Sequence, residues 1–347
     1  QSVLDRVQPG DVIEIKSGIY FEDLKTRVDG TENARITIKG VGGRENVVIR
    51  GSGEQSRVVQ LQNDYYTLQD FTIDGQAWDD VSDVGAGNAK QAFRDILIYV
   101  AVDRDATERS GGYMSALDGL VIKGMVIQHA LSECVRLRHF VTYAVIEDNI
   151  ILDCGLLDFE YDDGQNGEGV YIGTALAQWD EAKNFSGGED VCLGNVIRNN
   201  EIVTNGNEGV DVKEGCQHTF IENNDISMQR DENSGGVSSH ADNTVITGNT
   251  ITHADGAGVR VGTTVPDESG HLHGIDNTVT GNTLIDCTSF GLKIMSTPQR
   301  TICGNEVVLP AGQTEETYSG GTYGADYEPF ESCDSIPSPT PSTSAPS

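Results

Sequence analysis

The fold of this chain is decided by the stretch Glu208–Asp225, EGVDVKEGCQHTFIENND. It predicts a short strand, a tight turn, a second strand and a corner at Asn224. The same order of residue types recurs elsewhere in the chain, at EGVYI (168–172), VIRNN (196–200), VITGN (245–249) and TVTGN (278–282). A short unit that repeats in this way indicates one elongated body rather than separate globular domains.

The repeat length identifies the type of repeat. Asn224 follows Asn200 by 24 residues, Asn249 follows Asn224 by 25, and Asn305 follows Asn282 by 23. This spacing is typical of one coil of a parallel β-helix, and loop insertions at 155–194 and 263–276 account for the longer intervals. Leucine-rich repeats have a similar period, but their leucine consensus is missing. We expect apolar residues to stack into a narrow core, and each asparagine to bond its neighbours above and below from a corner whose backbone tolerates the left-handed region.

We therefore predict an all-β, single-stranded right-handed parallel β-helix (a solenoid) over residues 1–310. Residues 311–335 would form a C-terminal cap, and residues 336–347 a disordered-type Ser/Thr/Pro-rich tail or linker. Such tails are frequent O-glycan acceptors, which gives Thr340, Ser342 and Thr343 as candidates. A sequon at Asn184 predicts an N-glycan on a surface loop.

Composition excludes several partners. There are 23 Lys and Arg against 54 Asp and Glu, a formal net charge of −31, so nucleic acid is a poor partner. No apolar run approaches the roughly 18 residues of a membrane span, so we expect no membrane insertion. The acidity indicates either solubility in an extracellular medium or carboxylates that hold Ca²⁺.

The seven cysteines favour an oxidising compartment and hence secretion. Cys192 and Cys216 occupy the same place in consecutive repeats. Because stacked coils lie about 4.8 Å apart, inside the usual Cα separation of a disulfide, we predict a bridge between them. Cys303 is expected to pair with Cys287 or with Cys333, and the odd count leaves one thiol over.

Two columns of side chains should point outward from the first strand of successive coils, if the valines of those strands face the core. One column holds Arg136, Tyr171, Asp211, Ser238, Arg260 and Lys293, and the other holds Arg138, Gly173, Lys213, His240, Gly262 and Met295. Half of these positions can carry positive charge, which indicates a basic stripe that binds an anionic polysaccharide. The alternative is that the cations pair with Asp and Glu on adjacent coils.

Substrate-binding candidates on this surface are Arg136, Arg138, Tyr171 and Lys293. Trp179, in an insertion, is either a platform on which a sugar stacks or an anchor for its loop.

Asp211 and Lys213 are the candidates for chemistry, because they lie on one face of one strand. The ordinary pKa of lysine is about 10.4. Burial and a neighbouring cation such as Arg260 would lower the Lys213 pKa until it can act as a base, removing the proton α to a uronate carboxylate. Arg260 or Arg136 would neutralise that carboxylate.

Other groups offer alternatives in the same region. Ca²⁺ held by Asp211, Glu208 or Glu168 would replace the arginine. His240 is a second acid/base candidate or a structural residue. Tyr171 is a proton donor or a sugar contact. Asp162 and Asp163, in the acidic loop DFEYDDG (158–164), form either a second calcium site or a solvated loop.

Two motifs carry a resemblance. The opening PGDVIEI (9–15), followed by Gly18-Ile19-Tyr20, resembles the first coil of secreted right-handed parallel β-helix proteins, including many polysaccharide lyases. Val212-Lys213 before an asparagine-corner coil is similar to the alginate lyase and chondroitinase B family, in which a lysine on a strand is the base. The resemblance implies that Lys213 is the base here. Ser238-Ser239-His240 stands where that family carries an Arg-His pair, so its arginine is missing.

Two functions are compatible with these observations. One is a secreted protein that acts as a lyase on an acidic polysaccharide. The other is a non-catalytic, glycosylated subunit that self-associates into an extracellular filament or cell wall, which the acidity and the Ser/Thr/Pro tail favour. The fold does not choose between them.

Overall fold

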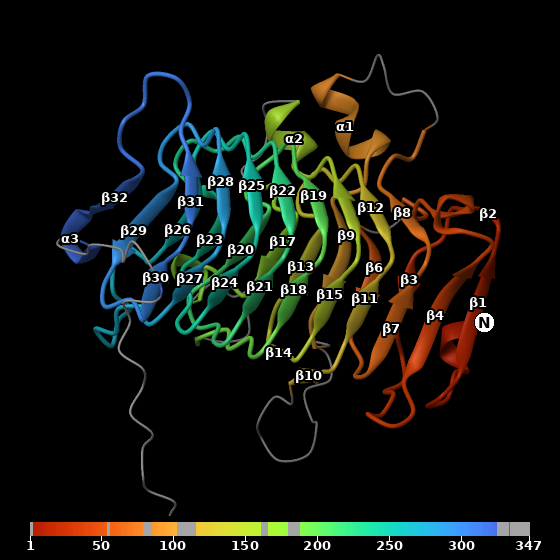
Figure 1. The fold of residues 1–347 in the computed structure, drawn as a ribbon. Helices are drawn as coiled ribbons and strands as arrows, with labels where there is room; N and C mark the ends of the chain where they lie inside the picture. The colour runs from red at the N-terminus through yellow and green to blue at the C-terminus, as the bar shows by residue number, and fades with distance from the viewer. Residues whose placement is uncertain are drawn as a thin grey trace, which may run out of the picture.

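A computed structural model describes residues 3–53, 56–78, 85–102, 116–160, 166–179, 188–324 and 333. Its chain winds repeatedly around one axis, and three parallel sheets of ten strands each run along the length of the molecule (Figure 1). The predicted right-handed parallel β-helix is confirmed. Within the described residues, none of the helices has the length and apolar composition that a membrane crossing needs.

Each coil contributes one strand to each sheet. The first sheet consists of β1 (Val12–Lys16), β4 (Ile36–Val41), β7 (Tyr66–Gln69), β11 (Val121–Lys123), β15 (Val145–Glu147), β18 (Val196–Arg198), β21 (Phe220–Glu222), β24 (Val245–Thr247), β27 (Thr278–Thr280) and β30 (Thr301–Cys303). The second consists of β2 (Gly18–Tyr20), β5 (Val47–Ile49), β8 (Thr72–Asp74), β12 (Val126–Gln128), β16 (Ile150–Leu152), β19 (Glu201–Val203), β22 (Asp225–Ser227), β25 (Thr250–Thr252), β28 (Thr283–Ile285) and β31 (Glu306–Val308).

The third sheet carries the outward columns. It consists of β3 (Leu24–Lys25), β6 (Arg57–Leu61), β9 (Ile96–Val100), β13 (Val135–Leu137), β17 (Val170–Ile172), β20 (Val210–Val212), β23 (Gly235–Ser239), β26 (Ala257–Val261), β29 (Leu292–Ser296) and β32 (Thr317–Gly320). A small parallel pair lies outside the three sheets, β10 (Leu117–Asp118) with β14 (Val141–Thr142). The helices are short: α1 (Ala86–Ala92), α2 (Leu156–Phe159), α3 (Gly321–Gly324) and the 3₁₀ turns Val3–Asp5, Arg44–Asn46 and Leu176–Gln178.

The β-helix continues beyond residue 310, where the sequence placed its end. Strand β32 pairs with β29 and completes the third sheet, and α3 follows it directly. The predicted tail at 336–347, with Thr340, Ser342 and Thr343, lies outside the described residues, and so does Asn184.

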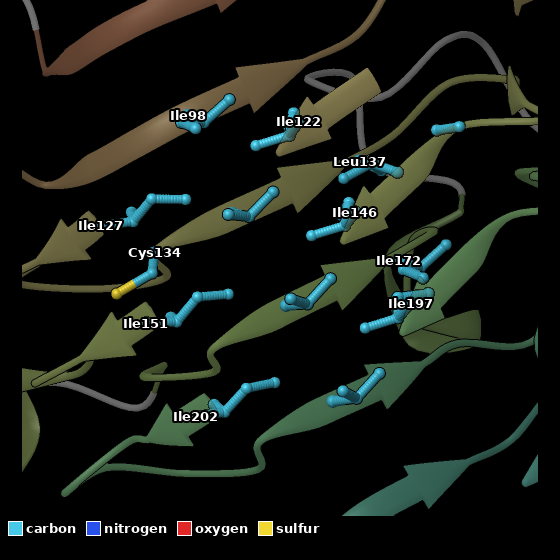
Figure 2. Packing of buried hydrophobic residues seen from close by; sticks show 14 of the residues in the cluster. Ile98, Ile122, Ile127, Cys134, Leu137, Ile146, Ile151, Ile172, Ile197 and Ile202 are labelled. Carbon is cyan, nitrogen blue, oxygen red and sulfur yellow. The ribbon is translucent and has the colours of Figure 1, made fainter. Parts of the chain in front are cut away.

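The core is built from columns of aliphatic side chains. In the first sheet Ile122, Ile146 and Ile197 stack in register on successive coils, and all are almost fully buried. They face the column of Ile127, Ile151 and Ile202 from the second sheet across a narrow interior (Figure 2). β-Branched residues suit this arrangement because they pack well on a pleated surface. Each fully buried isoleucine contributes roughly 1.5–3 kcal/mol.

A ladder of buried asparagines forms the corner between the first and second sheets. The Asn200 amide donates to Asn224 Oδ1 at 2.9 Å, and Asn224 donates to Asn249 Oδ1 at 2.9 Å. The same bond links the remaining neighbours of the ladder, Asn149 to Asn200, Asn249 to Asn282 and Asn282 to Asn305. The predicted ladder is confirmed.

The left-handed backbone lies one residue before the ladder asparagine. Asn199 and Asn223 have φ of 54° and 53°, and Gly248 has 66°. The preceding residue makes the turn, and the ladder residue then directs its amide inward. Asn, Asp and Gly tolerate the left-handed region best, which explains the Asn-Asn and Gly-Asn pairs of the repeat.

The predicted Cys192–Cys216 disulfide is wrong, because both residues are buried free thiols. Their thiols are adjacent, but Cys192 contacts Asp190 Oδ1 at 3.5 Å and Cys216 contacts the Ile172 carbonyl at 3.7 Å. Burial raises the Cys192 pKa well above its usual value. Disulfide chemistry proceeds through the thiolate, which this environment disfavours.

Two other disulfides are present. Cys134 and Cys154 are bridged at a turn between the second and third sheets, with a Cα separation of 5.5 Å. The alternative pairing of Cys303 with Cys333 is confirmed, and Cys287 is a free thiol.

Replacing Asn224 by alanine should destabilise the protein by about 3 kcal/mol, because the buried backbone and amide N–H groups of Asn200 lose their acceptor. Asn305→Ala is the matched control. Asn305 is only partly buried and ends the ladder, so its loss should cost less. Chemical denaturation measures both, and equal costs would contradict a cooperative buried ladder.

Titration of thiols in denaturant without reductant should give three reactive groups per chain, since Cys192, Cys216 and Cys287 are unpaired. After full reduction the same titration should give all seven cysteines. A value of one before reduction would show that Cys192 and Cys216 are bridged after all.

Candidate functional site

The first outward column of the third sheet is aligned as predicted. Arg136 pairs in register with Tyr171, Tyr171 with Asp211, Asp211 with Ser238, Ser238 with Arg260, and Arg260 with Lys293. The expectation that these side chains face open solvent is wrong for the middle of the column. Asp211 and Ser238 are completely buried and Tyr171 is 4% exposed. Arg136 and Lys213 lie over the Tyr171 ring, and Lys213 also contacts Asp211.

Two cations lie close to the Tyr171 ring. The Arg136 guanidinium lies 4.9 Å from the centre of its ring, and Lys213 Nζ lies 5.2 Å from it. These distances are those of cation–π contacts. Burial raises the Tyr171 pKa well above its usual value, although Lys213 and Arg136 act in the opposite direction. The phenol therefore keeps its proton.

Four buried carboxylates lie against these cations. Glu133, Glu168 and Glu208 each stand two residues before the first core valine of β13, β17 and β20, and they are 0%, 4% and 5% exposed. Glu133 pairs with Arg136 at 3.1 Å, and Ser234 Oγ donates to Glu208. Asp211 contacts Lys213 Nζ.

Burial, with repulsion from neighbouring carboxylates, raises the pKa of two of these carboxyl groups, Glu168 and Glu208. Burial, followed by Glu133, Glu208 and Asp211, raises the Glu168 pKa well above its usual value. Burial and Asp211 raise the Glu208 pKa to about 7, against the opposing effects of Lys213 and Ser234.

The lowered pKa expected for Lys213 is not found. Burial does act to lower it, but Asp211, Tyr171, Glu208 and Glu168 together raise the Lys213 pKa well above its usual value. Arg260, the cation expected to lower the pKa, instead donates to His240. Lys213 is therefore an ammonium as long as the surrounding carboxylates are charged.

His240 is held as a neutral imidazole. Burial, with the charges of Arg260 and Lys213, lowers its pKa well below the usual value. Its Nε2 lies 2.9 Å from Arg260 Nη1 and must accept, since arginine only donates. Its Nδ1 then carries the proton and points to Glu214 Oε1 at 3.6 Å. Since Nε2 accepts from Arg260, His240 orients Arg260 rather than acting as a base.

The remaining substrate-binding candidates are spread around this centre. Arg138 is buried and donates to Thr174 Oγ1 at 2.8 Å. Lys293 Nζ lies 3.4 Å from the Asn233 carbonyl, and burial and Arg260 lower its pKa. Trp179 donates from Nε1 to the Thr174 carbonyl at 2.9 Å, which anchors the ring beside a surface hollow.

Glu168, Glu208 and Asp211 can hold a cation. One oxygen from each lies within 4.8 Å of the others. Neither oxygen of Asp211 accepts a well-formed hydrogen bond within the described part of the chain. Three converging carboxylates with spare oxygen lone pairs fit a hard divalent cation such as Ca²⁺. Asp162 and Asp163, predicted as further ligands, lie outside the described residues.

The predicted basic stripe is a mixed cluster. Arg136 and Lys213 contact carboxylates of their own coils, Glu133 and Asp211, rather than of adjacent coils as the alternative held. The neutral His240 faces Glu214 of the preceding coil. Sequence analysis missed Glu133 and Glu214. The signal for Glu133 was present, because Glu-X-Val occurs at the start of three successive third-sheet strands, β13, β17 and β20.

In the presence of a chelator, the free energy of unfolding should fall between about pH 5 and pH 8. The Glu208 pKa of about 7 lies above its ordinary value, so the folded state binds the extra proton, and this stabilisation is lost as pH rises through 7. Glu208→Gln should flatten the profile by up to about 3 kcal/mol. Stability rising with pH in this window would contradict the assignment.

Known proteins share the fold of this chain. The family described as the right handed beta helix region matches residues 180–323. No curated protein matches the sequence significantly. Among solved structures, an alginate lyase from Paenibacillus sp. str. FPU-7 is 19% identical with a TM-score of 0.67, covering 92% of this chain and 94% of that one.

Two further structures share the architecture with lower coverage of their own chains. The catalytic unit of a GH87 α-1,3-glucanase from Streptomyces thermodiastaticus is 16% identical (TM-score 0.56, 86% of this chain, 50% of that one). Tailspike protein 2 of the Escherichia coli O157:H7 bacteriophage CAB120 is 9% identical (TM-score 0.55, 86% of this chain, 35% of that one). At these identities the likeness shows the fold: the chain is a right-handed parallel β-helix.

Proposed function

We propose that this chain is an extracellular β-helix protein that cleaves an anionic polysaccharide by β-elimination. The observation that carries the proposal is the group of Lys213 and Tyr171, which lie together on the third sheet among arginines and buried carboxylates. The likeness to the alginate lyase over 92% of this chain supports the same class of substrate. The two disulfides agree with an oxidising, extracellular location.

The reaction divides into two proton transfers around a carboxylate. A base removes the proton α to the uronate carboxylate, a carbon–carbon double bond forms, and the β carbon–oxygen bond of the glycosidic linkage breaks. The departing oxygen takes up a proton. Positive charge near the carboxylate stabilises the carbanion-like transition state, and Arg136 and Arg260, from the same column of side chains, are its proposed source.

Lys213 is the proposed base. Its high pKa depends on charged neighbours, because burial by itself acts to lower it. Neutralisation of Glu168, Glu208 and Asp211 removes the charges that raise the Lys213 pKa. The ammonium would then release its proton more easily, and the amine would face the substrate.

A divalent cation such as Ca²⁺, held by Glu168, Glu208 and Asp211, would supply that neutralisation and could polarise the uronate carboxylate. Proton uptake by Glu208, with its pKa of about 7, achieves part of the same effect. The carboxylate cluster therefore sets the protonation state of the base.

Tyr171 is the proposed proton donor to the departing oxygen. Its raised pKa keeps the proton on the phenol until the leaving oxygen becomes basic. The two cations beside the ring favour the phenolate that forms afterwards. The environment of Lys213 thus suits removal of a proton from the substrate, and that of Tyr171 suits donation of a proton to the departing oxygen.

Release of unsaturated uronide from alginate, pectate and glycosaminoglycans tests the proposal. Lys213→Ala and Tyr171→Phe should each lower kcat by about 10²–10⁴, the usual contribution of an acid/base group. Lys123→Ala is the matched control, since Lys123 is a half-buried lysine on β11 of the first sheet. Full activity in Lys213→Ala would exclude Lys213 as the base. An inactive wild-type protein that assembles into filaments would favour the structural function instead.

The cation is tested by the same assay with Ca²⁺ or chelator. Activity of the wild-type chain should depend on Ca²⁺, and Glu208→Gln should weaken that dependence because one of three converging ligands is lost. Calcium binding measured calorimetrically should weaken in parallel. Equal calcium affinity in Glu208→Gln and wild type would rule out this cluster as the site.

A further inference from the structure

We propose that Asp242, His271 and His273 form a binding site for a divalent transition-metal ion of the Zn²⁺ type. One ligand atom from each residue lies within 4.8 Å of the other two. Two imidazoles and a carboxylate make the mixed nitrogen and oxygen donor set that Zn²⁺ accepts, whereas Ca²⁺ takes oxygen ligands. This site is chemically distinct from the all-carboxylate cluster on the third sheet.

The three residues come from two separate parts of the fold. Asp242 lies just after β23, at a turn where it forms a bridge with Gln217 of the preceding coil. His271 and His273 belong to the insertion at 263–276, between β26 and β27. A bound ion would therefore tie the insertion to the body of the β-helix.

The donors converge closely. His271 Nε2 lies 2.9 Å from Asp242 Oδ2. The rings of His271 and His273 have centres 4.5 Å apart and are nearly perpendicular at 87°. This contact keeps both imidazoles beside Asp242, where one nitrogen of each ring can reach a single ion.

Neighbouring groups hold the ligands in orientation. Asp242 Oδ1 accepts from the Ile275 backbone at 3.0 Å, which leaves Oδ2 toward His271. Asp267 Oδ2 lies 3.2 Å from His273 Nε2. Its Oδ1 accepts from the Ser269 and His271 backbones at 2.8 and 2.9 Å. Carboxylates of this kind commonly fix metal-bound histidines, so Asp267 is a positioning residue.

The exposed side chain of His271 gives the ion a route from solvent to the site. The His271 side chain is 45% exposed, whereas those of Asp242 and His273 are 12% and 2% exposed. The ion would enter from the His271 side. His273 also contacts the Trp179 ring edge-on, with ring centres 5.6 Å apart. Metal binding would thus steady the wall of the hollow lined by Trp179, Pro266 and Glu268.

Zinc binding to the untagged, chelator-treated full chain tests the proposal. Calorimetry and metal analysis after dialysis should give one tightly held Zn²⁺ per chain. Co²⁺ should show ligand-field bands typical of a four-coordinate ion. Asp267→Asn should weaken binding about 10–100-fold, the usual effect of losing an outer partner of a ligand. His271→Ala and Asp242→Asn should weaken it further.

Three controls separate this site from others. His253→Ala removes an exposed histidine whose Nε2 lies 4.0 Å from Asp286, away from the cluster, and should leave zinc affinity unchanged. Glu208→Gln should also leave it unchanged, which excludes zinc bound at the carboxylate cluster. Lys213→Ala should retain zinc whether or not the chain is a lyase. No retained zinc in the wild type, or wild-type affinity in His271→Ala, would overturn the proposal.

Discussion

Parallel pairing between successive coils is the constraint on which the rest of this structure depends. Each strand lies in register on the equivalent strand of the previous coil, as Val210 lies on Val237 and Ile146 on Ile197. A residue type that recurs in the repeat therefore becomes a continuous column in space. Isoleucine columns fill the core, and the asparagine column satisfies buried backbone groups at one corner. Both columns are cooperative, since each residue within a column is held by the equivalent residues of the coil before it and the coil after it.

The same constraint concentrates charge on the third sheet. Three glutamates at equivalent positions of successive coils are brought together in a buried cluster, where burial, with repulsion from neighbouring carboxylates, raises the pKa of Glu168 and Glu208. The cost of burying a charge is offset only by a partner. Arg136 and Lys213 are those partners for Glu133 and Asp211, and the pKa of Lys213 in turn depends on the carboxylates. Charge on this face is thus set by the whole cluster rather than by single residues.

The repeat made most of the fold predictable. Core valines and isoleucines, the asparagine corner and the alignment of Arg136 with Tyr171 and Asp211 all follow from a period of one coil. The predictions were wrong where a local side-chain contact overrides the arrangement that the coil repeat implies. Cys192 and Cys216 are stacked as expected, but they contact Asp190 and the Ile172 carbonyl instead of bonding to each other. Cys134 and Cys154 are bridged at a turn. In a turn, the spacing of residues along the chain does not indicate which residues lie next to each other.

The sequence by itself determined the architecture, because strand period, turn residues and apolar alternation are local properties that any coil must satisfy. It also brought Lys213, Tyr171 and Asp211 onto one face. Only the tertiary structure decided what that face contains: side chains assumed to be solvated are buried, and Lys213 is an ammonium because carboxylates from two successive coils surround it. Burial and long-range electrostatics depend on every neighbour at once. For the same reason the sequence did not predict that Asp242 lies beside His271 and His273. These residues come together only when the insertion that carries the histidines folds back on its coil.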